Sequence, residues 1–424
     1  MRLTHRKRRK RSRNIIIGLL IIGLSIFSLY YYLSKEPLTD EDISSKQTTS
    51  EQEKPTVEKD SSNENDTAVE KEEPFINIQL AAAGDIMFHD TQLKSAYDQQ
   101  TDTYDFTPFF EDVKQILSEA DLTIANFETT AAGPEKTYTG YPQFNSPDEV
   151  VDAIKYAGVD VLTTVNNHSL DTGSDGLKRT VKTIQERGID TVGTYAEKPN
   201  SRVLIKEVEG IKLAFIAYTE STNGLGANYP REQLDDMLNM MEKDKIIADI
   251  QEAKQLEADF IVSFMHWGIE YATEPSEQQI EFAQLMAEEG VDLILGSHPH
   301  VIQKSDIIET DEKNTFVIYS MGNFISNQRQ ETLGDGYELT EDGIILLFDI
   351  QKDISTNETT IKHVEYIPTW VYRHQKPADT TYEYRILPID DFLQSDEIDE
   401  QYKQRMERSK SSTVSKMIES PFEN

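Results

Sequence analysis

Four segments of the chain repeat one pattern, in which a short apolar run ends at side chains that could bind a metal ion. The runs and the polar residues that follow them are 120–125 with Asn126 and Glu128, 159–162 with Asn166, Asn167 and His168, 258–262 with His266, and 291–295 with His298 and His300. Apolar runs that do not alternate with polar residues are typical of parallel strands covered on both faces. In such sheets, functional side chains collect just beyond the carboxyl ends of the strands. The pattern therefore predicts that Asn, Glu and His side chains meet at one edge of a parallel sheet.

The amino terminus carries the signals of a membrane anchor. Residues 1–13 hold eight Lys or Arg and no acid, and residues 14–33 contain no charged side chain. The uncharged stretch is long enough to cross a bilayer as a helix, and the basic end is expected to stay in the cytoplasm. A cleaved signal peptide is the alternative, but residues 29–35 offer no small-residue cleavage site. We therefore predict a transmembrane anchor over 14–33, a disordered linker over 34–74 and a main domain outside the cell membrane.

Composition limits the partners and the chemistry of the chain. The formal net charge of −34 argues against a nucleic-acid partner, because an anionic surface repels a polyphosphate. The absence of cysteine excludes a disulfide framework and a thiolate metal site. The sequence also lacks a glycine-rich phosphate loop and a Gly-x-Ser-x-Gly motif, so it predicts neither ATP-driven ligation nor a serine hydrolase.

Strand and helix patterns alternate between residues 75 and 390. Strands are predicted at 75–83, 315–319, 343–350 and 360–372 in addition to the four repeated runs, and 202–208 with 211–217 form a predicted hairpin. Helices are predicted at 147–157, 174–187, 233–256 and 276–289. This alternation indicates one layered α/β domain. Residues 391–424, with a weak helical pattern near 397–408, are predicted to form a C-terminal tail.

The ends of the predicted strands indicate a metal site. Asp85 closes the first strand, and four of the eight histidines of the chain stand at the ends of later strands. Carboxylate, amide oxygen and imidazole ligands together suit Mn²⁺, Fe²⁺ or Zn²⁺ better than Mg²⁺ or Ca²⁺. Two such ions that share a carboxylate would activate water and hold a phosphoryl group. The residues themselves therefore favour a metal-assisted phosphoester hydrolase.

An ordered set of short motifs resembles the CapA/PgsA poly-γ-glutamate capsule synthesis family, which is similar to the calcineurin-like metallophosphoesterases. The motifs span about 75–370 and are 84–87 (GDIM), 126–128 (NFE), 166–168 (NNH), 266–270 (HWGIE), 296–300 (GSHPH) and 319–324 (YSMGNF). The resemblance implies a four-layer αββα sandwich. It also implies a membrane-anchored, extracytoplasmic protein that serves poly-γ-glutamate synthesis or export alongside separate membrane partners.

The resemblance also implies roles for individual residues. By analogy with the metallophosphoesterases, Glu128 is the bridging carboxylate, Asn167, His266 and His298 complete one metal site, Asp85 and His300 belong to the other, and His168 is the acid that faces the leaving group. Asn126, Glu220, Trp267 and Asn323 are candidates for the substrate-binding surface, and Glu270 is a candidate for orienting His266.

One position departs from the pattern. Metallophosphoesterases place a His two residues after the first Asp, where this chain has Met87, and a thioether is a poor ligand for these cations. His89 lies nearby but is predicted to be an ordinary loop histidine. We therefore expect one firmly held ion and a second that is weak or absent. Two alternatives to a capsule-synthesis factor stay open: a surface phosphoesterase of nucleotidase type, and a non-catalytic scaffold on the same fold.

Overall fold

The computed structural model describes residues 74–376 and 381–419. The predicted basic end and transmembrane anchor, and the predicted linker up to residue 73, lie outside the described residues. Within the described part of the chain, no helix combines the length and the apolar character that a membrane span requires.

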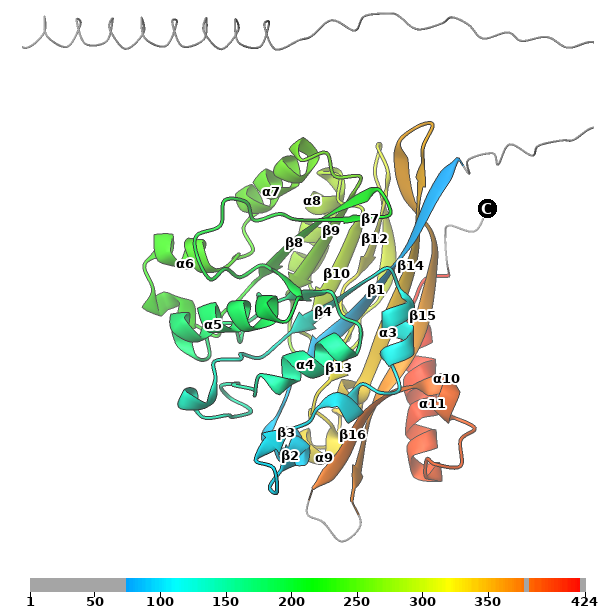
Figure 1. The fold of residues 1–424 in the computed structure, drawn as a ribbon. Helices are drawn as coiled ribbons and strands as arrows, with labels where there is room; N and C mark the ends of the chain where they lie inside the picture. Colours follow the sequence, from blue (N-terminus) through cyan, green and yellow to red (C-terminus); the bar gives the residue numbers. More distant parts are fainter. Residues whose placement is uncertain (1–73, 377–380, 420–424) are drawn as a thin grey trace, which may run out of the picture. The chain divides into compact units, whose positions relative to one another are not determined.

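Most strands belong to an eight-stranded and a six-stranded sheet (Figure 1). The larger sheet has the order β16-β15-β14-β1-β4-β5-β6, and β13 also pairs with β1. Its strands are β1 (Phe75–Ile86), β4 (Leu122–Phe127), β5 (Val161–Thr163), β6 (Asp190–Val192), β13 (Asn323–Ile325), β14 (Asp342–Asp353), β15 (Glu358–Gln375) and β16 (Tyr382–Pro388). The smaller sheet has the order β11-β12-β10-β9-β8-β7, with β7 (Leu204–Val208), β8 (Ile211–Thr219), β9 (Phe260–His266), β10 (Leu293–Ser297), β11 (Ser305–Glu309) and β12 (Asn314–Ile318). A separate short pair consists of β2 (Tyr97–Asp98) and β3 (Thr103–Tyr104).

Ten α-helices accompany the sheets in the described part of the chain. They are α2 (Asp90–Ala96), α3 (Lys114–Glu119), α4 (Glu149–Tyr156), α5 (Gly173–Glu186), α6 (Arg231–Met237), α7 (Lys243–Gln255), α8 (Glu277–Glu288), α9 (Gln330–Leu333), α10 (Ile389–Phe392) and α11 (Glu400–Val414). Apolar residues of α3 and α4 form one core with the larger sheet, and apolar residues of α7 and α8 form another with the smaller sheet. The mixed α/β class predicted from the sequence is therefore confirmed.

Successive residues of one strand face different cores. Leu80 and Ala82 of β1 lie in the core between the two sheets, whereas Ala81 and Ala83 lie under the helices of the larger sheet. In β10, likewise, Leu293 faces the core between the sheets and its neighbour Ile294 faces α7 and α8. Because both faces are buried, both faces must be apolar, which explains why the repeated runs do not alternate with polar residues.

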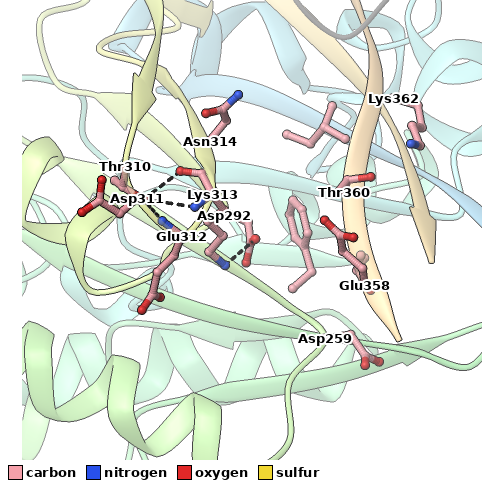
Figure 2. A pocket seen from close by; sticks show the side chains of 13 residues that line it. Asp259, Asp292, Thr310, Asp311, Glu312, Lys313, Asn314, Glu358, Thr360 and Lys362 are labelled. Atoms are coloured by element: carbon pink, nitrogen blue, oxygen red, sulfur yellow. Dashed lines mark hydrogen bonds and ion pairs between the residues drawn. The ribbon is translucent and has the colours of Figure 1, made fainter. Parts of the chain in front are cut away.

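All four repeated runs lie in parallel strand pairs. β4 pairs with β1 and β5, and β9 pairs with β8 and β10, each in parallel. Each run begins beside an Asp whose carboxylate accepts a hydrogen bond from the backbone of the neighbouring strand. The distances are 2.7 Å from Gln79 N to Asp121, 3.0 Å from Thr123 N to Asp160, 2.8 Å from Lys212 N to Asp259, and 2.8 Å from Ile261 N to Asp292. Figure 2 shows Asp259 and Asp292 beside a pocket of about 830 Å³ at the amino ends of the smaller sheet.

The predicted long helix over 233–256 is two helices, α6 and α7. Between them the chain runs along the end of β8, where Met241 N donates to Thr219 O at 2.8 Å and Asn239 N donates to Gly193 O at 2.9 Å. These backbone groups are satisfied by neighbouring segments rather than by a helix, so the helix stops. The partners are remote in sequence, and the helical pattern of the segment could not reveal them.

Residues 391–424, predicted as a tail, include α11, which packs beside β14 and β15 (Figure 1). Met406 of α11 is fully buried. Arg405 pairs with the buried Glu341, and Arg408 pairs with the buried Asp342. The helix is mostly polar along its length, and it docks through the buried Met406 together with these ion pairs to residues far away in sequence. The folded domain therefore continues through the described residues beyond 390.

Candidate metal centre

Strand ends from both sheets deliver the predicted ligands to one place. Asp85 lies at the end of β1, Glu128 directly follows β4, and His266 is the last residue of β9. His298 and His300 follow β10. Asp85 and Glu128 have no exposed surface, and His266 and His300 are almost completely buried. The parallel topology thus buries carboxylates and imidazoles together, where charged groups require compensation.

Two glycines allow the backbones to approach closely at this point. A Cβ atom at Gly84 would stand 2.1 Å from the carbonyl oxygen of Gly322, and a Cβ atom at Gly296 would stand 2.0 Å from the carbonyl oxygen of Tyr319. The loop after Gly296 then places His298 at φ 96° and His300 at φ 57°. Left-handed backbone at a residue other than glycine costs free energy and concentrates at functional sites.

Glu128 occupies the middle of the cluster. Its Oε1 atom lies 3.6 Å from His266 Nε2 and 3.7 Å from His300 Nε2, and it has no hydrogen-bond partner within the described residues. A buried carboxylate oxygen is normally hydrogen-bonded. An oxygen placed between two imidazole nitrogens is suited to bridging two cations, which is the role that the resemblance implied for Glu128.

Two of the three groups of potential ligands among the described residues share Glu128. Glu128, His266 and His298 offer ligand atoms within 4.8 Å of one another, and so do Asp85, Glu128 and His300. Asn167 joins the first group, because its Oδ1 lies 3.0 Å from His266 Nε2. The structure thus brings together all six predicted ligands, in the two predicted sets.

The polar atoms and the pKa shifts of these residues also fit a bound cation. His298 Nδ1 and Glu128 Oε1 are buried without a hydrogen-bond partner in the described part of the chain. Burial and the neighbouring Asp85 raise the pKa of Glu128 well above its usual value. Burial also lowers the pKa of His266, and it lowers that of His298 to about 4. Neutral imidazoles are the form that binds metal, and a divalent cation would compensate two buried carboxylates.

Neighbouring side chains orient the imidazoles. His300 Nδ1 lies 3.1 Å from Asn323 Oδ1 and 3.2 Å from Asp85 Oδ2, and because both are acceptors, Nδ1 carries the proton and Nε2 keeps its lone pair. His266 Nδ1 lies 2.9 Å from Ser297 Oγ. Asn323, predicted to contact substrate, therefore positions His300, and Ser297 is a partner that the sequence did not single out.

Two other predicted substrate-binding residues lie in the interior. Asn126 is fully buried, donates to Asp85 Oδ1 at 2.7 Å and accepts from Thr163 Oγ1 at 3.0 Å. Trp267 is fully buried in the core under α7 and α8, where its Nε1 donates to Tyr319 O at 3.0 Å. Asn126 therefore holds Asp85, and Trp267 packs. The roles of both residues depend on neighbours that are distant in sequence.

Glu220 and Glu270 are exposed residues beside the centre. Glu220 Oε2 accepts from the backbone N–H of Gly268 at 3.0 Å and so anchors the loop that follows β9. Glu270, predicted to orient His266, instead groups with His298 and His300, with ligand atoms within 4.8 Å of one another.

His168 forms a buried pair with Asp171. The distance from His168 Nδ1 to Asp171 Oδ2 is 2.7 Å, and Asp171 Oδ2 also accepts from Phe144 N at 2.7 Å. The ring of Phe144 meets the His168 ring edge to face at 4.7 Å. A carboxylate that fixes Nδ1 leaves Nε2 for a reacting group. Asp171 was not predicted, although its position three residues after His168 is a usable signal.

Met87 and His89 do not join the centre. The His89 ring nitrogen Nδ1 lies 3.3 Å from Gln92 Oε1 at the start of α2, and burial lowers the pKa of His89 to about 4. Among the described residues, no group of potential ligands includes His89. The position that metallophosphoesterases give to a second histidine is therefore without an imidazole in this chain.

Fold and site together define the class of this molecule: a mixed α/β protein with a candidate centre for divalent cations. Residues 79–328 match the family described as bacterial capsule synthesis protein PGA_cap, which is more than half of the chain. The chain therefore belongs to this family, as the ordered motifs indicated.

Curated relatives agree with this assignment. The chain is 32% identical over 250 residues to the capsule biosynthesis protein CapA of Bacillus anthracis, covering 56% of this chain and 59% of that protein. It is 27% identical over 249 residues to the PGA biosynthesis protein CapA of Bacillus subtilis, covering 58% and 61%. The chain thus matches about three fifths of the length of these relatives.

Two solved structures illustrate the similarity in chain trace. One is the calcineurin-like phosphoesterase YfkN of Bacillus subtilis, at 13% identity and a TM-score of 0.41, covering 81% of this chain and 99% of that one. The other is the NAD nucleotidase of Haemophilus influenzae, at 11% identity and a TM-score of 0.44, covering 81% and 64%. These likenesses say nothing of the activity of this chain.

Proposed function

We propose that this protein serves the biosynthesis or export of capsular poly-γ-glutamate at the outer face of the cell membrane. The observation that carries the proposal is the convergence of six potential ligands within the region that matches the capsule synthesis family. The names of the curated relatives, both from capsule or PGA biosynthesis, support the same role.

The candidate metal centre is where an anionic polymer would make contact. The chain has a formal net charge of −34, so most of its surface repels a polyglutamate chain. Divalent cations held by Asp85, Glu128, Asn167, His266, His298 and His300 would supply positive charge that binds and polarises a carboxylate or phosphoryl group. The hydrogen-bonded pair of His168 and Asp171 is available beside it for proton transfer.

The proposed location and partners rest on the amino terminus and on the motifs that the sequence lacks. Residues 14–33 are proposed to anchor the protein, with residues 1–13 in the cytoplasm and the main domain outside. Since the sequence lacks a phosphate loop, ligation of glutamate is assigned to separate membrane components of a synthase or export complex. Protease treatment of intact cells should degrade the main domain and spare an amino-terminal cytoplasmic tag.

The test is a deletion strain scored for surface polymer and complemented with variants of the full chain. Wild type and His374→Ala, a histidine on β15 outside the metal groups, are expected to restore the polymer. His298→Ala and His168→Ala are expected not to restore it, at matched surface abundance on an immunoblot. Normal polymer in the deletion strain would overturn the proposal, and restoration by both site variants would leave only a scaffold role.

A second function, hydrolysis of small phosphate esters, is favoured by the His168–Asp171 pair, because a buried histidine fixed by a carboxylate is a typical acid for a leaving group. Purified full chain would be assayed against a panel of nucleotides with added Mn²⁺ or Zn²⁺. Turnover that His168→Ala abolishes while metal binding persists, together with unaltered polymer in the deletion strain, would favour this function over the first.

A further inference from the structure

The two halves of the candidate metal centre are unequally supplied with ligands. One half has four side chains, Glu128, Asn167, His266 and His298. The other half has Asp85 and His300 beside the shared Glu128. Met87 is buried and cannot provide the further nitrogen that the metallophosphoesterase pattern supplies at its position. The second half therefore needs one more ligand.

We propose that Glu270 is that ligand, and that it binds the second cation together with His300. Its carboxylate offers an oxygen within 4.8 Å of ligand atoms of both His298 and His300. Two ligands on opposite sides of one ion stand about 4.4 Å apart at ordinary metal–ligand lengths. The upper limit on these spacings is therefore close to the span of two ligands of one ion, and the exposed Glu270 side chain can change its rotamer.

The backbone holds Glu270 next to the histidine loop. Tyr271 N donates to Pro299 O at 2.7 Å, and Tyr271 adopts φ 67°, so the loop after β9 is tied to the segment that carries His298 and His300. Gly268 at φ 94° and its hydrogen bond to Glu220 fix the other end of this loop. The carboxylate is therefore presented to the centre by the fold and is not an unconstrained surface acid.

The hydrogen-bond partners of His300 also support a cation at this position. Its Nδ1 faces Asp85 Oδ2 and Asn323 Oδ1, so the lone pair is on Nε2, which lies 3.7 Å from Glu128 Oε1. That oxygen is buried without a hydrogen-bond partner in the described residues. A cation at Nε2 would satisfy Glu128, and Glu270 would complete its coordination from the solvent side. An exposed ligand also predicts that this second ion exchanges readily.

The inference deepens the proposed function, since it rests on the same metal centre, and its test reads metal binding rather than polymer. Full-length protein purified in detergent would be stripped of metal and titrated with Mn²⁺ by calorimetry, and the magnetic coupling of two Mn²⁺ ions would be followed by electron paramagnetic resonance. Wild type is expected to bind two ions in two steps. Glu270→Gln is expected to weaken the second step at least tenfold, to leave the first unchanged, and to lose the coupled signal at limiting Mn²⁺.

The matched control is Glu274→Gln, the same charge change four residues further along the same loop, at an exposed residue outside the metal groups. It is expected to bind both ions as wild type does. Wild-type affinities for both ions in Glu270→Gln, equal weakening of both steps, or a single ion in wild type would each overturn the inference. If the polymer test fails while the second ion depends on Glu270, the metal ligand stands and only the proposed biological role falls.

Discussion

The two ends of the same parallel strands carry similar side chains in opposite situations. At the amino ends, Asp259 accepts from Lys212 N and pairs with Lys352 at 2.7 Å, and Asp292 accepts from Ile261 N and pairs with Lys313 at 2.6 Å. Figure 2 shows Asp292 bonded to Lys313 at the wall of the pocket there. Each carboxylate has a donor and a cation from the chain itself.

At the carboxyl ends the chain does not provide these partners. Glu128, His298 and Asn167 each keep a buried polar atom without a hydrogen-bond partner among the described residues. No Lys or Arg pairs with Asp85 or Glu128 among the described residues, where the ring nitrogens of His266 and His300 are their near neighbours. The comparison shows two uses of a buried carboxylate. Where the chain supplies a hydrogen-bond donor and a Lys, the carboxylate stabilises the fold, and where the chain supplies no Lys or Arg and leaves an oxygen without a donor, the carboxylate is available to bind a cation.

The largest effect is expected at the amino ends. Asp292→Ala should lower the free energy of unfolding by about 3 kcal/mol, because it leaves the buried Ile261 N–H without an acceptor and removes the ion-pair partner of the partly exposed Lys313. Asp292→Asn keeps an acceptor for the N–H and should lose less. Urea denaturation of the metal-free protein measures both. Metal affinity should not change in either variant. A change would contradict the assignment of a purely structural role to Asp292.

At the carboxyl ends, substitution of a carboxylate is expected to weaken cation binding rather than to destabilise the fold. Glu128→Gln should weaken binding of both cations on the order of 100-fold, since both halves of the centre share this carboxylate. Without metal, the variant should be at least as stable as wild type, because it removes a buried carboxyl beside Asp85. Calorimetric titration and thermal unfolding of the stripped protein test the two statements. A marked loss of stability without metal would show that Glu128 is structural.

The smallest expected effect is a pH dependence of metal binding. The pKa of Glu128 is raised in the folded, metal-free protein, so below that pKa this carboxyl holds a proton that a cation must displace. The affinity should therefore fall as the pH is lowered, by up to about tenfold per pH unit below that pKa. The pKa of His298 is lowered to about 4, so this imidazole adds little to the pH dependence above that pH. Titrations in two buffers of different ionisation enthalpy count the released proton, and an affinity that does not vary with pH would contradict the assignment.

Much of the fold and of the centre could be predicted because the relevant signals are local. A largely apolar run such as 291–295 indicates a strand buried on both faces, and parallel strands bring the residues at their carboxyl ends to one edge. Asp85, Glu128, Asn167, His266, His298 and His300 were found in this way and lie together. This local pattern could not reveal the roles of Asn126, Asn323 and Trp267, because each role depends on a partner that only the packing of the chain brings close.

The sequence by itself determined which segments become buried strands and which side chains end them, since an apolar run and the polar residues that follow it are neighbours along the chain. Only the tertiary structure decided which polar groups meet. It placed Asp171 against His168, Glu270 beside His300, and α11 against Glu341 and Asp342. Hydrogen bonds and ion coordination act over a few ångströms, so they depend on distances between segments that lie far apart along the chain.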